Sequence, residues 1–220
     1  MMSTQHTDCQ VQDAGIWKAW VLICIAESHR IGVTPISATQ LHVTLYLANT
    51  LASLFDVHRV RGRVLKRGEF PFYPDVQNEI DRLAFNGVLK IERVDFGAKG
   101  HMTPHFGIGP KGLETYQMFM KRIPDAARVA RLFRELIAAC FGRFLAANAA
   151  IGPIDANYGS NLVFENEVVY FSEWTDENEN KNMEVAQYLL TRLKAMRPHA
   201  DRDGVRLYCD YLDEALAPAL

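Results

Sequence analysis

The sequence predicts an α+β fold that is mostly α. Apolar residues recur at helical spacing along much of the chain, as in Leu41, Leu45 and Ala48. One segment, 88–96, alternates apolar and polar residues instead, and a glycine turn separates it from a second extended segment. Of the 220 residues, 49% are apolar, which is enough to bury a core without additional cross-links.

Two helices are expected first. Residues 1–13 are polar and predict a flexible N-terminus, followed by a helix over about 15–29. Ser37 or Thr39 can cap the next helix, whose apolar stripe runs on to Phe55. The following segment, 57–73, alternates too irregularly to predict a strand, so we interpret it as a basic connector.

The stretch "FPFYPDVQNEIDRLAFNGVLKI" predicts a third helix and a strand. Pro74 suits the first position of a helix, where its missing N–H costs nothing. Gly87 suits the left-handed position that ends a helix. The strand 88–96, the turn 97–100 and the segment 101–109 then form a hairpin, in which Pro104 indicates an exposed edge. The apolar side of the helix comprises Val76, Ile80, Leu83 and Ala84.

Three helices followed by a hairpin is the element order of a winged helix. We therefore predict an N-terminal winged-helix domain, 14–120, which includes a further helix over 110–122. The remainder, 121–220, is predicted to be a mainly helical C-terminal extension that packs on it. Its expected helices are 124–144, 183–196 and 205–216, with a loop over 149–162, either a strand or a helix over 161–171, and an acidic turn over 172–182.

Charge divides the chain unevenly and suggests two kinds of contact surface. Residues 1–153 carry a net charge of about +5 and residues 154–220 about −7, so the two parts could face different partners or simply be solvated. Basic side chains that could contact DNA phosphates or an acidic partner are Arg59, Arg61, Arg63, Lys66, Arg67, Lys90, Arg93 and Lys99. The expected protein-partner surface comprises Asp75, Gln77, Asn78, Glu79 and Asp81 on the third helix, and Glu173, Asp176, Glu177 and Glu179 in the acidic turn.

The third helix is a poor candidate for reading DNA bases. Base recognition needs polar donors on the helix that enters the groove. Here the predicted outer face carries three carboxylates, which would be repelled by the phosphates that line the groove. We therefore expect protein docking first, and DNA contact, mainly non-specific, second.

No catalytic, metal or cofactor site is predicted. The segment from Asp176 resembles a calcium loop but has Lys181 where glycine is needed and Gln187 where a bidentate carboxylate is needed. His101 and His105 lack further metal ligands nearby. The sequence has no nucleophile elbow and no phosphate-binding loop. We predict a non-enzymatic protein without cofactors.

The chain is expected to be cytoplasmic. No apolar run approaches the roughly 20 residues of a membrane span, and the N-terminus lacks the pattern of a secretory signal. The four cysteines are far apart in sequence and form no Cys-x-x-Cys pair, so we expect reduced thiols.

Over roughly residues 15–120 the sequence resembles a known family. The order of "LHVTLYLANTLA", "FPFYPDVQNEIDRLAFNGVLKI", a hairpin and "GPKGLETY" is similar to winged-helix middle components of bacterial ABC three-component antiphage systems, the Lamassu type. The resemblance implies an accessory subunit that bridges an SMC-like ATPase and an effector nuclease. The same order of features occurs in winged-helix transcription regulators and in SocA-like antitoxins, which remain the alternatives.

Overall fold

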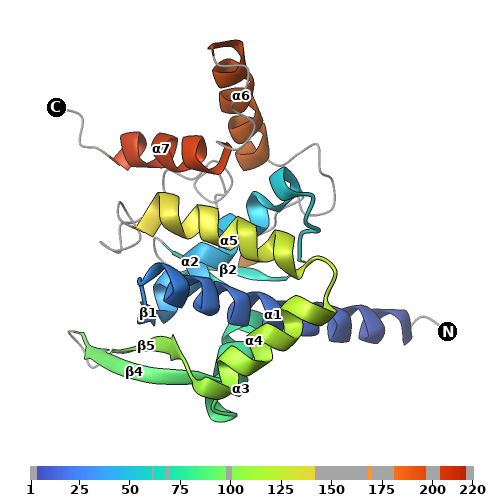
Figure 1. Cartoon of the computed structure of the whole chain (residues 1–220), viewed down its shortest axis with the longest axis vertical. Coiled ribbons are helices and arrows are strands. Elements are labelled where there is room, and N and C mark those ends of the chain that lie inside the picture. The colour runs from blue at the N-terminus through green and yellow to red at the C-terminus, as the bar shows by residue number, and fades with distance from the viewer. Residues whose placement is uncertain are drawn as a thin grey trace.

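The computed structural model describes residues 4–60, 62–67, 70–97, 101–141, 168–169, 181–196 and 204–216. Helices dominate these residues, and two small antiparallel sheets accompany them, so the predicted α+β, mostly α class is confirmed (Figure 1). The helices are α1 (Thr4–Ile31), α2 (Ala38–Thr50), α3 (Pro74–Phe85), α4 (Pro110–Arg122), α5 (Ala126–Cys140), α6 (Lys181–Met196) and α7 (Gly204–Leu216), with a 3-10 turn η1 (Ala52–Phe55). The strands are β1 (Ile36–Ser37), β2 (Val64–Arg67), β3 (Phe70–Phe72), β4 (Leu89–Phe96), β5 (Met102–Ile108) and β6 (Val168–Val169).

The central helix α1 begins at Thr4, so the predicted start near residue 15 is wrong. Most of the segment expected to be a flexible N-terminus is helical. The segment 4–14 has no apolar stripe, and hydrophobic periodicity therefore gave no signal there. It also has no Gly or Pro to stop a helix, and extending an existing helix costs far less than starting one.

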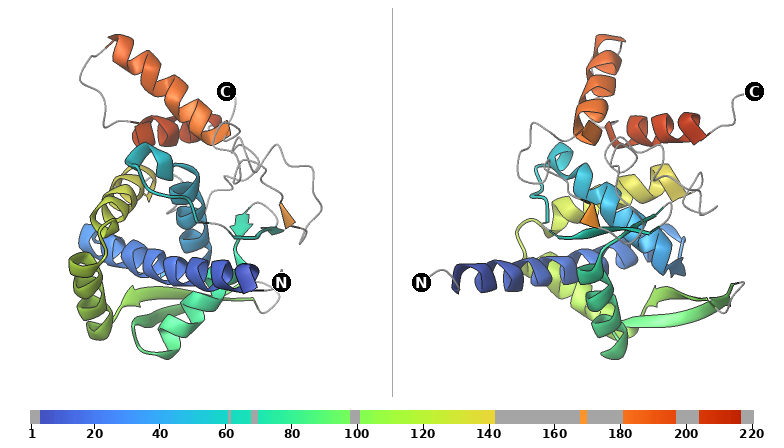
Figure 2. Two further views of the ribbon diagram at one scale, coloured as in Figure 1. Left: turned by 90° about the vertical axis from the view of Figure 1, so that its right-hand side faces the viewer. Right: turned by 180° about the vertical axis from the view of Figure 1, so that it is seen from behind.

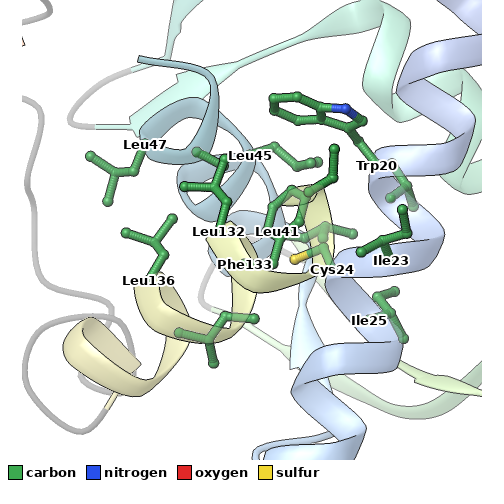
Figure 3. Packing of buried hydrophobic residues seen from close by; sticks show 14 of the residues in the cluster. Trp20, Ile23, Cys24, Ile25, Leu41, Leu45, Leu47, Leu132, Phe133 and Leu136 are labelled. Atoms are coloured by element: carbon green, nitrogen blue, oxygen red, sulfur yellow. The ribbon is translucent and has the colours of Figure 1, made fainter. Parts of the chain in front are cut away.

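The hydrophobic core lies between α1, α2 and α5. Figure 3 shows Trp20 and Ile23 of α1 beside Leu41 and Leu45 of α2, with Phe133 of α5 between the two helices. The Trp20 and Phe133 rings meet edge to face, with 5.5 Å between their centroids. The apolar stripe along α5 is thus internal core, and Arg128, Arg131 and Arg134 lie on the exposed side of the helix.

The second helix is capped at Ser37, one of the two predicted positions. The Ser37 hydroxyl accepts the backbone N–H of Gln40, whose side chain accepts the backbone N–H of Ser37. This reciprocal capping box satisfies donors that the first helical turn would leave unpaired. The start of α2 at Ala38 is therefore fixed three residues after Pro35, directly after β1.

One sheet has the strand order β1–β5–β4, and its β4–β5 hairpin matches the prediction. The hairpin reaches well beyond β1, which pairs only Ile36 with Phe106 and Ser37 with His105. Pro104 lies past the end of β1, where the outer side of β5 has no partner strand among the described residues. The prediction that Pro104 marks an exposed edge is confirmed for this part of β5.

The segment 57–73 contains two strands, so the prediction of a connector without strands is wrong. β2 pairs with β3 and, on its other side, with β6 far along the chain. Local alternation could not reveal this pairing, because long-range partners supply much of a strand's stability. Pro71 is compatible with the pairing since β3 is an edge strand.

Helix α3 and its ends follow the prediction closely. Pro74 lies in the first turn, and Val76, Ile80 and Leu83 are buried, with Ala84 partly buried. Gly87 adopts φ +69°, the left-handed conformation that favours glycine. The Val88 N–H then donates to the Leu83 carbonyl, closing the helix and leading the chain into β4.

The C-terminal helices form the end of the molecule opposite the β4–β5 hairpin (Figure 2). α5 packs on α1 and α2, α7 packs on α5, and α6 packs on α7. The helices predicted over 183–196 and 205–216 are confirmed as α6 and α7. The expected loop 149–162 and nearly all of the acidic turn lie outside the described residues. We find no helix with the length and apolar character of a membrane span in the described part of the chain.

Cys140 of α5 and Cys209 of α7 form a disulfide, contrary to the expectation of reduced, separated thiols. Their Cα atoms are 5.8 Å apart although 69 positions separate them in the sequence. Packing of α7 on α5 brings them together, and sequence spacing could not show it. Cys24 is buried in the core as a free thiol, and burial raises its pKa.

Candidate interaction site

A groove lies between the β4–β5 hairpin and the β2–β3 pair. We call it the hairpin groove, and its volume is about 750 Å³. Its base includes Ala38 and Thr39 from the first turn of α2, and Gln77 of α3 closes one side. The lining residues are Ala38, Thr39, His42, Arg67, Phe70, Pro71, Phe72, Gln77, His101, Met102, Thr103 and Pro104.

The inner wall of the groove is held by a chain of hydrogen bonds through the buried His42. Its Nδ1 accepts the backbone N–H of Tyr73 at 3.3 Å, so its Nε2 carries the proton and donates to Gln77 Oε1 at 3.1 Å. Gln77 in turn donates to Asp81 at 2.8 Å. Burial is the main cause that lowers the pKa of His42 to about 4, with a smaller contribution from the charge of Arg67. At neutral pH His42 is therefore an uncharged link from α2 to Tyr73, the residue between β3 and α3, and to Gln77 of α3.

Arg67 is the charged side chain of the β2–β3 wall. Its guanidinium lies 3.8 Å from the centre of the Phe72 ring, a cation–π geometry, and the Phe72 ring also lies 4.7 Å from that of His42. The register of β2 and β3 places Arg67 opposite Phe70, so Arg67, Phe70 and Phe72 share one face of the pair. The Arg67 side chain is exposed, yet the aromatic ring limits its orientations.

The hairpin presents an exposed apolar face. Val94 pairs with Pro104 and Phe96 with Met102, so these side chains share one face. Phe96 is 76% exposed and Met102 is 67% exposed. Phe106 and Ile108 continue the face along β5 into the core, where they are buried. Apolar side chains therefore extend from the core along the hairpin to the groove.

The structure brings one of the predicted basic residues, Arg67, into the groove. Arg93 instead forms an ion pair with Asp95 at 2.9 Å, and its guanidinium lies 3.2 Å from His105. The others are spread along the connector, β2 and β4: Arg59 and Lys66 are half-buried, and Arg63 and Lys90 are exposed. Arg61 and Lys99 lie outside the described residues.

The structure exposes only part of the partner surface predicted on α3. Glu79 is 4% exposed and forms an ion pair with Arg82 at 2.7 Å, so its placement on an open surface is wrong. The helical pattern put Glu79 outside because its neighbour Ile80 is the apolar position, whereas the tertiary packing covers both. Asn78 and Asp81 are exposed, and Asp75 and Gln77 are half-buried. The acidic-turn residues Glu173, Asp176, Glu177 and Glu179 lie outside the described residues.

The two histidines considered as a metal site, His101 and His105, lie in different environments. His105 is buried and lies 2.8 Å from Asp95, whereas His101 is exposed at the rim of the groove. Within the described ranges no cluster of His, Cys, Asp or Glu could hold a metal ion. Of the calcium-like segment, residues 176–180 lie outside those ranges, and Lys181 and Gln187 belong to helix α6.

Sequence reasoning missed His42 and the Phe70–Phe72 wall as site residues. His42 is a polar residue inside an otherwise apolar helix, a weak signal that does not indicate which element it faces. The aromatic residues were visible beside two prolines, but their role depends on the pairing of β2 with β3.

Comparison with protein-family models finds no match to this chain, and comparison with curated proteins finds none either.

Proposed function

We propose that the chain is a winged-helix protein whose hairpin groove docks a partner protein, and that it acts as a non-enzymatic accessory subunit. The order α1, β1, α2, α3, β4, β5 with the sheet order β1–β5–β4 supports the winged-helix assignment. The observation that carries the docking proposal is the exposed apolar face of the hairpin beside the groove. Exposed contiguous apolar side chains are typical of interaction sites.

The charges of α3 favour protein over DNA as the main partner. Asp81 is exposed on the helix that a DNA-binding winged helix would insert into the groove of DNA, and Arg82 is engaged by Glu79. A carboxylate in that position would be repelled by the phosphates. On the hairpin, Arg93 is engaged by Asp95, and Phe96 and Met102 offer apolar contact instead of cations. DNA contact, if made, would rest on the scattered exposed cations and would be non-specific.

The family resemblance supplies the cellular setting of this proposal. In that setting the partners are an SMC-like ATPase and an effector nuclease of a bacterial antiphage complex. A winged helix with an open groove can bind another subunit without catalysing a reaction, and this supports the proposal. The opposite end of the molecule, formed by α6 and α7, offers a separate surface for a second subunit (Figure 1).

A tagged pull-down from the native host, with nuclease treatment and mass spectrometry, tests the proposal. We expect the wild type to recover a large coiled-coil ATPase and a nuclease-like protein. The double variant Phe96→Ser, Met102→Ser should lose one of them. Phe85→Ser is the matched control, because Phe85 is 92% exposed but lies at the end of α3, away from the apolar face of the hairpin strands. Recovery of the chain alone, as a dimer that binds one DNA sequence, would instead identify a transcription regulator.

A further inference from the structure

Among the described residues, no strand pairs with the outer edge of β5 where it borders the groove. In an antiparallel sheet, successive residues direct their backbone N–H and C=O groups to alternate sides. The His101 carbonyl accepts the Gly97 N–H from the β4 side at 2.8 Å, so Met102 and Pro104 direct their backbone groups to the other side. β1 covers that side only as far as His105, because α2 begins at Ala38. The Met102 N–H and the Met102 and Pro104 carbonyls therefore face the groove.

The walls beside this edge have the chemistry of a peptide site. Met102 and Pro104 provide apolar contact on one side, and Phe70 and Phe72 provide it on the other. Arg67 is the charged side chain of the lining, and among the described residues no carboxylate forms an ion pair with it. His42, the buried polar group of the wall, has both ring nitrogens engaged and is neutral at pH 7. The complementary ligand is thus extended, largely apolar and negatively charged at one position.

We propose that the hairpin groove binds an extended segment of a partner protein as an added strand on β5, with an acidic side chain of that segment paired to Arg67. This proposal rests on the docking function proposed above and specifies its ligand. Backbone hydrogen bonds to an open sheet edge supply affinity, and side-chain pockets supply specificity. Pro104 limits the added strand to a short one, because it offers no N–H along the edge. A carboxylate beside the ring-stacked Arg67 gains from a cation that is already oriented.

A first experiment identifies the ligand class. A phage library of random 12-residue peptides is selected against the full chain, and the enriched peptide is synthesised with a fluorescein label for anisotropy measurements. We expect enriched sequences with an acidic residue among alternating apolar residues. Enrichment of helical i, i+4 apolar spacing, of basic peptides, or of no peptide at all would overturn the proposal. Tighter binding of single-stranded DNA than of any peptide at moderate salt would also overturn it.

A second experiment tests the pairing with Arg67. Arg67→Glu should weaken binding of the acidic peptide at least tenfold, and a peptide with Lys in place of its acidic residue should recover binding to Arg67→Glu. Arg63→Glu is the control, because Arg63 is exposed nearby but does not line the groove. Equal losses in Arg63→Glu and Arg67→Glu, or no recovery by the charge-reversed peptide, would exclude the specific pair.

A third experiment tests the added strand. Met102→Pro removes the outward N–H without touching the bonds to β4, and Met102→Ala removes the side chain alone. We expect Met102→Pro to bind the peptide at least fivefold more weakly than Met102→Ala, with unchanged circular dichroism for both. Equal affinities would exclude backbone pairing at this edge. If these peptide tests fail while the pull-down still depends on Phe96 and Met102, docking survives and the extended-segment proposal does not.

Discussion

At the scale of single residues, burial decides what His42 can do. Its two ring nitrogens are fully used in the link from Tyr73 to Gln77, and its pKa of about 4 lies well below the ordinary value of 6.5. A proton on Nδ1 would break the bond to the Tyr73 N–H and place a charge in the interior, beside Arg67. Asp81 lies near enough to offset part of that charge, but burial dominates.

Acidification should therefore lower the free energy of unfolding, because the unfolded state binds a proton at His42 more readily than the folded state does. The unfolded state takes up a proton near pH 6.5, whereas the folded state resists it until about pH 4, so this contribution is intact above pH 6.5 and declines between these values. We expect a loss of about 2 to 3 kcal/mol in the free energy of unfolding between pH 7 and pH 4.5. Urea titrations of the wild type and of His42→Gln measure it. An identical pH dependence in both proteins would contradict the assignment.

At the scale of elements, Glu27 ties three helices together. Its carboxylate, on α1, is fully buried; it accepts the Tyr116 hydroxyl of α4 at 2.5 Å and Arg134 Nε of α5 at 2.9 Å. Arg30 adds a third contact at 2.9 Å. Burial opposes ionisation of Glu27, but the hydrogen bonds from Arg134 and Tyr116 and the two positive charges outweigh it, and the pKa of Glu27 is lowered. Ionised Glu27 thus helps hold α4 and α5 against α1 through specific polar contacts.

Glu27→Gln should lower the free energy of unfolding by about 2 kcal/mol at pH 7, since bonds to a charged carboxylate are lost inside the protein. The control Glu135→Gln breaks the surface pair with Arg131 and should cost less than about 0.5 kcal/mol. Because the pKa of Glu27 is lowered, its contribution is present above the ordinary carboxyl pKa and is lost as the pH falls through the lowered value. The difference between wild type and Glu27→Gln should accordingly shrink in acid. An equal decrease in the free energy of unfolding for both variants at pH 7 would contradict the larger contribution expected from the buried Glu27.

The β4–β5 hairpin depends on both local and long-range interactions. Its strands and the glycine that precedes them follow local patterns, and both were predicted. The extent of its free edge depends on β1, a strand of two residues that local patterns did not predict. The groove forms because β1 pairs with only two residues of β5 and because the β2–β3 pair lies across from the rest of that edge. Both features depend on contacts between segments that are far apart in the sequence.

At the scale of the whole molecule, α7 is joined to the main core. Tyr208 and Leu212 belong to the same buried cluster as Trp17 and Phe133, and the disulfide links Cys209 to α5. The C-terminal helices therefore share a core with the N-terminal elements, and the disulfide closes a long loop of chain between them.

Removing the disulfide should destabilise the protein by about 2 to 4 kcal/mol, because a cross-link over 69 residues restricts the unfolded chain. We expect a reductant to lower the urea midpoint of the wild type and to leave the Cys140→Ser, Cys209→Ser variant unchanged. Mass spectrometry of intact protein after thiol alkylation, without prior reduction, checks the bond. Alkylation of both cysteines in the unfolded, unreduced protein would contradict it.

The sequence by itself determined where most helices lie, the cap at Ser37, the ends of α3 and the hairpin strands. The signals involved are the spacing of apolar residues, Pro74, Gly87 and the Ser37 capping box, which all act within a few residues. It also indicated Arg67 and Gln77 as contact residues, although in two separate sets. The tertiary structure decided the pairing of β2 with β3 and β6, the burial of Glu79, the disulfide and the meeting of Arg67 with Gln77 in one groove. These features arise from contacts between segments far apart in the chain, and such contacts leave no local periodicity to read.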